Sequence, residues 1–187
     1  MSEAWVERFP EPEIPRGYTM PSMTARTMIA ALEAHHVSVV VGGGWAVDGL
    51  VGRETRAHTD LDIWVDACDT HSLFVAFAEL GLDRVLPWPD DRPWNFVLHD
   101  GVSRRVDLHL YESLTDGWLH YGGVTTPFIF TTDDFAGQGV IAGKPVRCES
   151  PEFALRNHTG YPTRDVDRHD VALLCETFGL ESPEGYV

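Results

Sequence analysis

Hydrophobic positions between residues 22 and 178 follow two different spacings along the chain. Apolar residues that recur every three or four positions predict helices, and short β-branched or alternating runs predict strands. The expected helices are 23–35, 45–51, 69–80, 151–158 and 165–178. The expected strands are 37–41, 61–65, 82–86, 94–99, 104–111, 140–142 and 145–148. This order predicts an α/β (α+β) fold, in which helices pack on a mixed sheet and two helices end the domain.

Turn and cap signals mark the ends of several of these elements. Asp100-Gly101 predicts a hairpin between the strands on either side of it. Asp69 is a typical N-cap for the helix that follows it. Ser150 followed by Pro151 predicts the start of the next-to-last helix, because proline suits the first helical turn.

The first 21 residues are acidic and Pro-rich, so we expect an irregular arm over 1–21 and a single domain over 22–187. At about 150 residues per domain, this length corresponds to little more than one domain. The arm lacks the basic and apolar stretches of a signal peptide, and no apolar run reaches the roughly 18 to 20 residues of a membrane span. The cysteines are widely separated and match neither a disulfide framework nor a CxxC metal site. Free thiols indicate a cytoplasmic protein.

The balance of charge limits the partners that the protein is expected to have. The chain carries 14 basic and 29 acidic residues, which gives a formal net charge of −15. This balance argues against a surface that follows nucleic-acid phosphates. It is compatible with a small cationic substrate, which an acidic cleft attracts, and equally with a surface that is charged only for solubility.

Two carboxylates, Asp60 and Asp62, stand at the start of the expected strand 61–65. Alternate residues of a strand point to the same side, and two residues of rise separate their Cα atoms by about 6.6 to 6.8 Å. Leu61 and Ile63 then point into the core, which fixes the register. Two like charges at this spacing repel unless a cation lies between them, and Mg²⁺ prefers such oxygen ligands. An Asp-x-Asp pair is also common in solvated loops, so the pair alone does not establish a metal site.

Asp107 supplies a third carboxylate, in the alternating run 104–111. The apolar residues of this run point to the core, so Asp107 and His109 share the opposite face. If the run lies beside strand 61–65, three carboxylates meet on one surface, as a two-metal site for an in-line displacement requires. The alternative for Asp107 is an ordinary surface residue. The nine histidines show no HExxH spacing, so we expect no structural zinc.

Gly42-Gly43-Gly44 follow an expected strand and open an expected helix. Glycine lets the backbone approach a phosphate closely, and a helix N-terminus offers free N–H donors to it. No Gly-Lys-Ser/Thr follows, which excludes a P-loop. A Rossmann site is disfavoured because Val47 stands where Gly or Ala is expected.

Arg53, Arg56 and His58 lie in the loop between these glycines and the first two carboxylates. Such side chains bind phosphate oxygens or steady a departing pyrophosphate, and the alternative is a solvated basic loop. We expect Asp48, on the short helix before the loop, to hold one of the arginines in place.

Taken together, these residues resemble a known family. The segment 43–52 (GGWAVDGLVG), with Thr55-Arg56, His58 and 60–63 (DLDI) after it, is similar to the opening of the antibiotic nucleotidyltransferases, above all the small lincosamide and the aminoglycoside 2″-nucleotidyltransferases. The similarity continues, in the family's order, through 105–109, 139–148, 150–152, 158–161 and 170–175. It covers most of residues 24–178. Within it, the matched residues His158, Tyr161 and Asp170 either orient the acceptor or only join the last helices to the sheet.

The resemblance implies a DNA polymerase β-like nucleotidyltransferase fold with a two-metal Mg²⁺ site. In that family, the residues matched by Gly43 and Gly44 hold the nucleoside triphosphate, which is the co-substrate. Those matched by Asp60 and Asp62 hold magnesium, and the one matched by Asp107 is a third metal ligand or the general base. The family often pairs its subunits, so a homodimer is an alternative to a monomer.

We therefore predict a Mg²⁺-dependent nucleotidyltransferase, with ATP as the expected donor and a hydroxyl of a small antibiotic-like acceptor, a lincosamide or an aminoglycoside, as the site of transfer. Its role would then be antibiotic resistance. The expected catalytic and metal-binding residues are Asp60, Asp62 and Asp107. The expected nucleotide-binding residues are Gly43, Gly44, Arg56 and His58. The alternatives are the same chemistry on a protein or tRNA acceptor, and a nucleotide-binding module without turnover.

Overall fold

The computed structural model describes residues 17–87, 93–123, 126–159 and 161–186, so most of the expected arm 1–21 lies outside the described residues. Its helices are α2 (Ser22–Ala34), α3 (Gly43–Val51), α4 (Thr70–Glu79), α5 (Pro151–Asn157) and α6 (Asp165–Phe178). Its strands are β1 (Val39–Val41), β2 (Leu61–Asp66), β3 (Arg84–Pro87), β4 (Asn95–His99), β5 (Arg105–Ser113), β6 (Trp118–Gly123), β7 (Thr126–Thr131), β8 (Gly137–Ile141) and β9 (Lys144–Cys148). Within these residues, no helix combines the length and the apolar character needed to cross a membrane.

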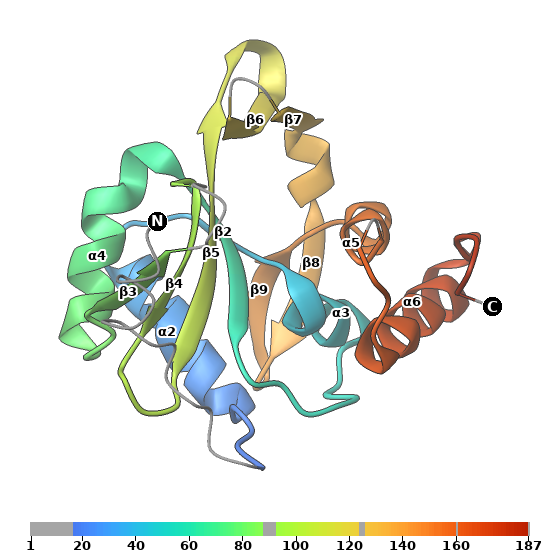
Figure 1. The fold of residues 1–187 in the computed structure, drawn as a ribbon, viewed down its shortest axis with the longest axis horizontal. Coiled ribbons are helices and arrows are strands. Elements are labelled where there is room, and N and C mark those ends of the chain that lie inside the picture. The colour runs from blue at the N-terminus through green and yellow to red at the C-terminus, as the bar shows by residue number, and fades with distance from the viewer. Residues whose placement is uncertain (1–16, 88–92, 124–125, 160, 187) are drawn as a thin grey trace.

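The strands form one mixed sheet in the order β3-β4-β5-β2-β1-β9-β8, and β6 and β7 continue from the far end of β5 (Figure 1). β2 runs parallel to β5 and antiparallel to β1, and β1 runs parallel to β9. The hairpin predicted around Asp100-Gly101 is confirmed, because β4 and β5 pair antiparallel on either side of it. The predicted mixed sheet with packed helices and two C-terminal helices is also confirmed.

One face of the sheet carries the main hydrophobic core. Leu32 of α2 and Phe77 of α4 are fully buried in one cluster with Leu61 and Ile63 of β2, as the alternation predicted. Burial of one such side chain contributes about 1.5 to 3 kcal/mol, which exceeds the preferences of single residues for strand or helix. The core therefore fixes the register of β2, and with it the face on which Asp62 lies.

The opposite face is partly covered by an aromatic cluster and by the C-terminal helices. Trp64 of β2 packs there with Phe130 of β7 and Phe153 of α5. Helices α5 and α6 lie toward the other end of the sheet from α4 (Figure 1). They pack on α3 through a small buried cluster of Val47, Ala154 and Leu174. This packing places both C-terminal helices beside the glycine turn.

The hairpin of β6 and β7 is an element to which the sequence pattern assigned nothing. Its strands pair along their whole length, and β6 also pairs with the end of β5. Leu119 and Phe130 turn inward and are buried, whereas Trp118 and Ile129 are exposed. The segment is rich in the aromatic and β-branched residues that are typical of strands. No Asn-Gly or Asp-Gly pair marks the connection between its two strands, so the turn signal that identified the β4–β5 hairpin is missing here.

Two predicted helix caps differ in outcome. The Oγ atom of Ser150 accepts a hydrogen bond from the Phe153 N–H at 3.2 Å, with Pro151 in the first turn, as predicted. Asp69 is the N-cap residue of α4, as predicted, but its side chain makes no capping hydrogen bond. A turn of 3₁₀ helix over Ala67–Asp69 precedes α4, and it gives Asp69 a backbone unlike the extended one that a capping side chain needs.

Candidate active site

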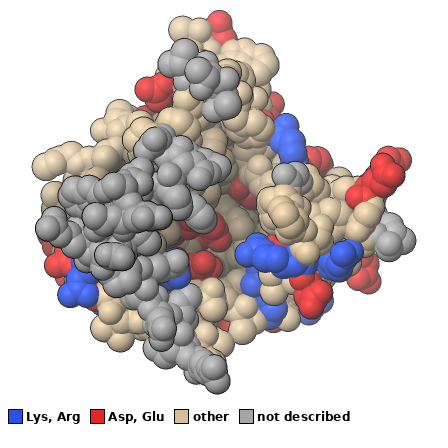
Figure 2. Space-filling view, viewed as in Figure 1, with Lys and Arg blue, Asp and Glu red and all other residues tan. Residues whose placement is uncertain are grey.

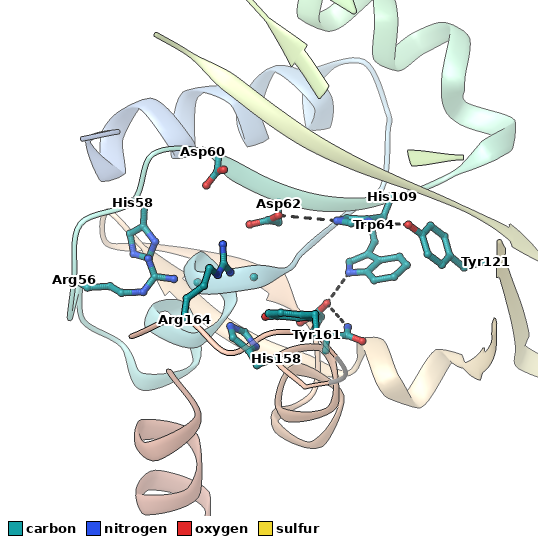
Figure 3. Close-up of a pocket in the computed structure, with 14 residues that line it drawn as sticks. Arg56, His58, Asp60, Asp62, Trp64, His109, Tyr121, His158, Tyr161 and Arg164 are labelled. Carbon is teal, nitrogen blue, oxygen red and sulfur yellow. Dashed lines mark hydrogen bonds and ion pairs between the residues drawn. The ribbon is translucent and has the colours of Figure 1, made fainter. Parts of the chain in front are cut away.

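A cavity of about 290 Å³ lies over the face of the sheet that carries Asp62. Its walls come from the start of α3, the loop before β2, strands β2, β5 and β6, and the segment between β9 and α6. Figure 2 shows acidic side chains in the central hollow and basic side chains on its side near the C-terminal helices. Figure 3 shows Asp60, Asp62, His109 and Arg164 around the same space.

Asp62 and Asp107 lie side by side on two parallel strands, because the register of β2 and β5 pairs these two residues. The next pair on the same face is Trp64 with His109. Asp62, Asp107 and His109 each offer one possible ligand atom, and these atoms lie within 4.8 Å of one another. The strand with Asp107 therefore lies beside the strand with Asp62, which was the condition for the carboxylates to meet. Together with His109, these side chains form a group suited to a divalent cation.

Asp60 lies just before β2 and lines the cavity beside this group (Figure 3). Burial and the negative charges of Asp62 and Asp107 raise the pKa of Asp60 to about 6, although Arg105 opposes the shift. Among the described residues, the close group of ligand atoms holds His109 rather than Asp60. The structure therefore brings two of the three predicted carboxylates together and leaves the third at their edge.

His109 is held in one orientation by two aromatic neighbours. Its Nδ1 lies 3.1 Å from the Tyr121 hydroxyl, and its ring stacks on Trp64 with 4.7 Å between the centroids. Its Nε2 lies 4.0 Å from Asp62 Oδ1 (Figure 3). Burial lowers the pKa of His109, but the neighbouring carboxylates outweigh burial and raise it overall. The imidazole therefore turns a hydrogen-bonding nitrogen toward the carboxylates, and Tyr121 of the unexpected hairpin helps to hold it there.

The glycine turn between β1 and α3 lies directly against these carboxylates. Gly43 has a φ of +55°, and a β-carbon on it would overlap the carboxylate of Asp62. A β-carbon on Gly44 would overlap the guanidinium of Arg56. Only glycine allows both close approaches, and at Gly43 it also allows the left-handed backbone. The free N–H groups at the start of α3 consequently lie between an acidic and a basic side chain, where a phosphate near a metal ion would lie.

Asp170 of α6 holds the side chain of Arg56, which lies in the loop before β2, against the start of α3. The Arg56 guanidinium donates through Nε to Asp170 Oδ1 at 2.9 Å and through Nη2 to Oδ2 at 2.7 Å. His158 Nε2 lies 3.2 Å from the same carboxylate, and its Nδ1 lies 2.7 Å from the Ala154 carbonyl oxygen. Burial lowers the pKa of His158, but the two acceptors outweigh burial and raise it. Burial raises the pKa of Asp170, but the hydrogen bonds from His158 and Arg56 lower it to about 2.

His58 lines the cavity but is only 3% exposed. Its Nε2 lies 2.6 Å from Asp48 Oδ2, and its ring stacks on Trp45 with 4.1 Å between the centroids. Asp48 also accepts a hydrogen bond from the Thr55 N–H at 3.1 Å. The expectation that Asp48 holds a loop arginine is therefore wrong, because its two oxygens are used by His58 and Thr55. A buried carboxylate takes the nearest donors on its own loop, and the arginine pairs with α6 instead.

Comparison with known proteins agrees with this geometry. A family model described as aminoglycoside-2″-adenylyltransferase matches residues 25–174, which is well over half of the chain. The chain belongs to this family. The predictions of a nucleotidyltransferase family, fold and enzyme class are thereby confirmed.

Individual members of the aminoglycoside-2″-adenylyltransferase family and its neighbours match along most of their length. A 2″-aminoglycoside nucleotidyltransferase of Escherichia coli is 26% identical over 166 residues, which cover 84% of this chain and 87% of that protein. A lincosamide resistance protein of Staphylococcus haemolyticus is 25% identical over 138 residues, which cover 74% of this chain and 84% of that protein.

Solved structures with a similar fold have also been determined with antibiotics. A lincosamide antibiotic adenylyltransferase with lincomycin bound has a TM-score of 0.73 and 23% identity, and the match covers 84% of this chain and 98% of that chain. ANT(2″)-Ia in complex with adenylyl-2″-tobramycin has a TM-score of 0.64 and 23% identity, and the match covers 84% of this chain and 89% of that chain. At this identity, the two structures establish the fold that the chain shares with them.

Several residues of this aminoglycoside-2″-adenylyltransferase family member line the cavity although the sequence did not single them out for it. They are Trp64, Tyr121, Glu149, Asn157 and Arg164. Arg164 donates to Asp167 at 2.7 Å, at the start of α6. A carboxylate directly after a buried strand was a signal for Glu149, because such a position lies at a sheet edge where ligands bind. The other four residues gave no local signal.

Proposed function

We propose that this protein transfers the AMP group of ATP to a hydroxyl of an aminoglycoside or lincosamide antibiotic and so confers resistance. One observation carries the proposal: the start of α3 contacts the carboxylate of Asp62 through Gly43 and the guanidinium of Arg56 through Gly44. A triphosphate at this turn would have helix N–H donors beneath it, metal-binding carboxylates on one side and a fixed cation on the other.

The side chains beside the turn fit magnesium. Asp60, Asp62 and Asp107 supply carboxylate oxygens, which Mg²⁺ prefers, and Asp62 and Asp107 are paired across parallel strands. The raised pKa of Asp60 reflects repulsion among these groups, and a divalent cation relieves such repulsion. When bound, magnesium would neutralise the triphosphate and lower the pKa of the acceptor hydroxyl.

The residues of the site then have separate roles in the transfer. The acceptor hydroxyl oxygen forms a bond to the α-phosphorus, the bond from that phosphorus to the β-bridging oxygen breaks, and pyrophosphate leaves in line. Asp107 receives the hydroxyl proton, and the Asn95 amide fixes its carboxylate by donating to Oδ1 at 2.8 Å. Arg56 and the start of α3 stabilise the leaving pyrophosphate. His58 supports the phosphate-binding loop through Asp48.

The acceptor class is supported by the relatives and by charge. The curated relatives are named as a 2″-aminoglycoside nucleotidyltransferase and a lincosamide resistance protein. Aminoglycosides and lincosamides carry both hydroxyl groups and amines that are protonated near neutral pH. A net charge of −15 and an acidic hollow suit such compounds.

The test is pyrophosphate release with Mg²⁺ and each of ATP, GTP, CTP and UTP, against tobramycin, other aminoglycosides, lincomycin and clindamycin, with product masses read in parallel. We expect ATP to give an antibiotic that is heavier by one AMP group, and EDTA to abolish the reaction. Transfer of another nucleotide would correct the donor. Absence of transfer to every compound, under conditions in which the protein is folded, would contradict the proposal.

A further inference from the structure

Glu149 is a carboxylate of the cavity wall that the proposed transfer does not use. It follows β9 and is 1% exposed. Its Oε1 accepts hydrogen bonds from Trp64 Nε1 at 2.6 Å and from Asn157 Nδ2 at 2.8 Å. Within the described part of the chain, Oε2 has no hydrogen-bond partner. Buried polar atoms in folded proteins nearly always have a partner, so an unpaired carboxylate oxygen beside a cavity indicates a ligand.

Glu149 lies close to the reacting centre, behind the glycine turn. A β-carbon on Gly42 would lie 3.1 Å from Glu149 Oε1. Glu149 lines the same cavity as Asp62 and His109. Its hydrogen bonds to Trp64 of β2 and Asn157 of α5 place it between the strand that carries Asp62 and the C-terminal helices.

The charges around the cavity favour a cation as the missing partner. Arg56 and Arg164 are each held by a carboxylate of α6 at 2.7 Å. The three aspartates of the proposed metal site would have magnesium as their counter-charge. Among the described residues, the hydrogen-bond donors to Glu149 are two neutral N–H groups, an indole and an amide. Burial raises the pKa of Glu149, because its charge is incompletely compensated there. A buried carboxylate in this setting gains most from a positively charged donor.

We propose that Glu149 binds a protonated amine of the antibiotic acceptor and selects acceptors that carry one. This inference rests on the proposed function and adds a specificity-determining residue to it. The ammonium N–H donates to Oε2, while Trp64 and Asn157 hold Oε1 in place. Oε2 is buried, so the amine reaches it after rotation of a side chain that lines the cavity.

The substitution that tests the proposal is Glu149→Gln. Glutamine keeps the shape and an oxygen for Trp64 and Asn157, and it removes the charge and the second acceptor. The matched control is Glu152→Gln, the same change at an exposed position in the first turn of α5. Thermal unfolding of both variants checks the fold. Glu149→Met, which fills the volume without a polar atom, is the second variant if glutamine destabilises the protein.

Steady-state kinetics with tobramycin or lincomycin as acceptor give the first result. Loss of a hydrogen bond to a charged group predicts that Glu149→Gln raises KM for the antibiotic by about 10-fold or more. We expect kcat and the KM for ATP to stay within about 2-fold, and Glu152→Gln to match the wild type. Acetylation of the tobramycin amines removes their charge, so it raises KM for the wild type and has little further effect on Glu149→Gln.

A binding measurement keeps this inference separate from the proposed function. Calorimetric titration of tobramycin and lincomycin into the wild type and Glu149→Gln compares affinities without turnover. Wild-type transfer with equal antibiotic KM and affinity in Glu149→Gln would overturn the role of Glu149 and leave the proposed function intact. A rise in KM for ATP alone would also overturn it, because Glu149 would then face the nucleotide.

Discussion

At the scale of single residues, each side chain of the site is fixed by a contact behind it. Asn95 donates to Asp107, Asp170 holds Arg56, and Asp48 holds His58. Groups fixed in this way lose little freedom when a substrate binds, which favours a reaction that depends on positioning and charge. The residues with direct roles are thus few, and each can be tested by a change that removes one function and little volume.

Asp62→Asn is the direct test of the carboxylate pair. The amide keeps the volume but is a poor ligand for Mg²⁺, so we expect transfer to fall by about 100-fold or more with an unchanged unfolding midpoint. Asp83→Asn is the matched control, because Asp83 is exposed and remote from the cavity lining. Turnover in Asp62→Asn close to that of the control would exclude Asp62 as a metal ligand.

At the scale of elements, the site depends on how β2, β5 and α3 meet. The parallel register of β2 with β5 puts Asp62 beside Asp107. The short connection through Gly42 brings the start of α3 against Asp62. The hairpin of β6 and β7 then adds Tyr121, which holds His109. One-residue slippage of β2 would turn Asp62 into the core, so burial of its apolar residues also secures the chemistry.

Two glycines at the two ends of α3 make a matched pair for testing this arrangement. Gly43→Ala requires a left-handed alanine and displaces Asp62, so we expect severe loss of transfer and weaker binding of ATP. Gly52 has a φ of +80° but nothing within 4 Å of a β-carbon. Gly52→Ala therefore costs about 1 to 2 kcal/mol of unfolding free energy and leaves turnover intact. Equal turnover in the two variants, measured with ATP and the accepted antibiotic, would exclude the Gly43 contact from function.

At the scale of the whole molecule, ion pairs join parts of the chain that are far apart in sequence. Arg56 and Asp170 are separated by 114 positions. Asp170 also contacts His158, so one buried carboxylate connects the loop before β2, α5 and α6. The C-terminal wall of the cavity is therefore fixed to the phosphate-binding turn by charge as well as by apolar packing.

Asp170→Asn should destabilise the protein much more than the same change at Asp165, which is exposed in the first turn of α6. Removal of one partner from a buried ion pair costs about 3 to 5 kcal/mol, whereas a charge near a helix N-terminus contributes about 0.3 to 1 kcal/mol. Urea unfolding at pH 7 measures both differences.

The difference in unfolding free energy between the wild type and Asp170→Asn depends on pH in a direction that the pKa of Asp170 determines. The pKa of Asp170 is lowered to about 2 in the folded protein, so its stabilisation is present above the ordinary value near 3.8 and is lost as the pH falls toward about 2. We expect the difference in unfolding free energy between wild type and Asp170→Asn to become smaller as the pH falls from about 3.8 to about 2. A difference in unfolding free energy that stays constant from pH 5 to pH 2 would show that folding does not stabilise the ionised form of the Asp170 carboxylate.

The sequence by itself determined the helices and most strands, the family, and the residues around the glycine turn. It did so because periodicity, glycine and paired acids are local signals, and because a domain core accepts only one register of each alternating strand. The partners of Asp48 and Asp170 and the unpaired oxygen of Glu149 were decided by the tertiary structure. They depend on contacts such as Arg56 with Asp170 and Trp64 with Glu149, which join segments distant in sequence. Local spacing carries no information about which donor a buried carboxylate will meet.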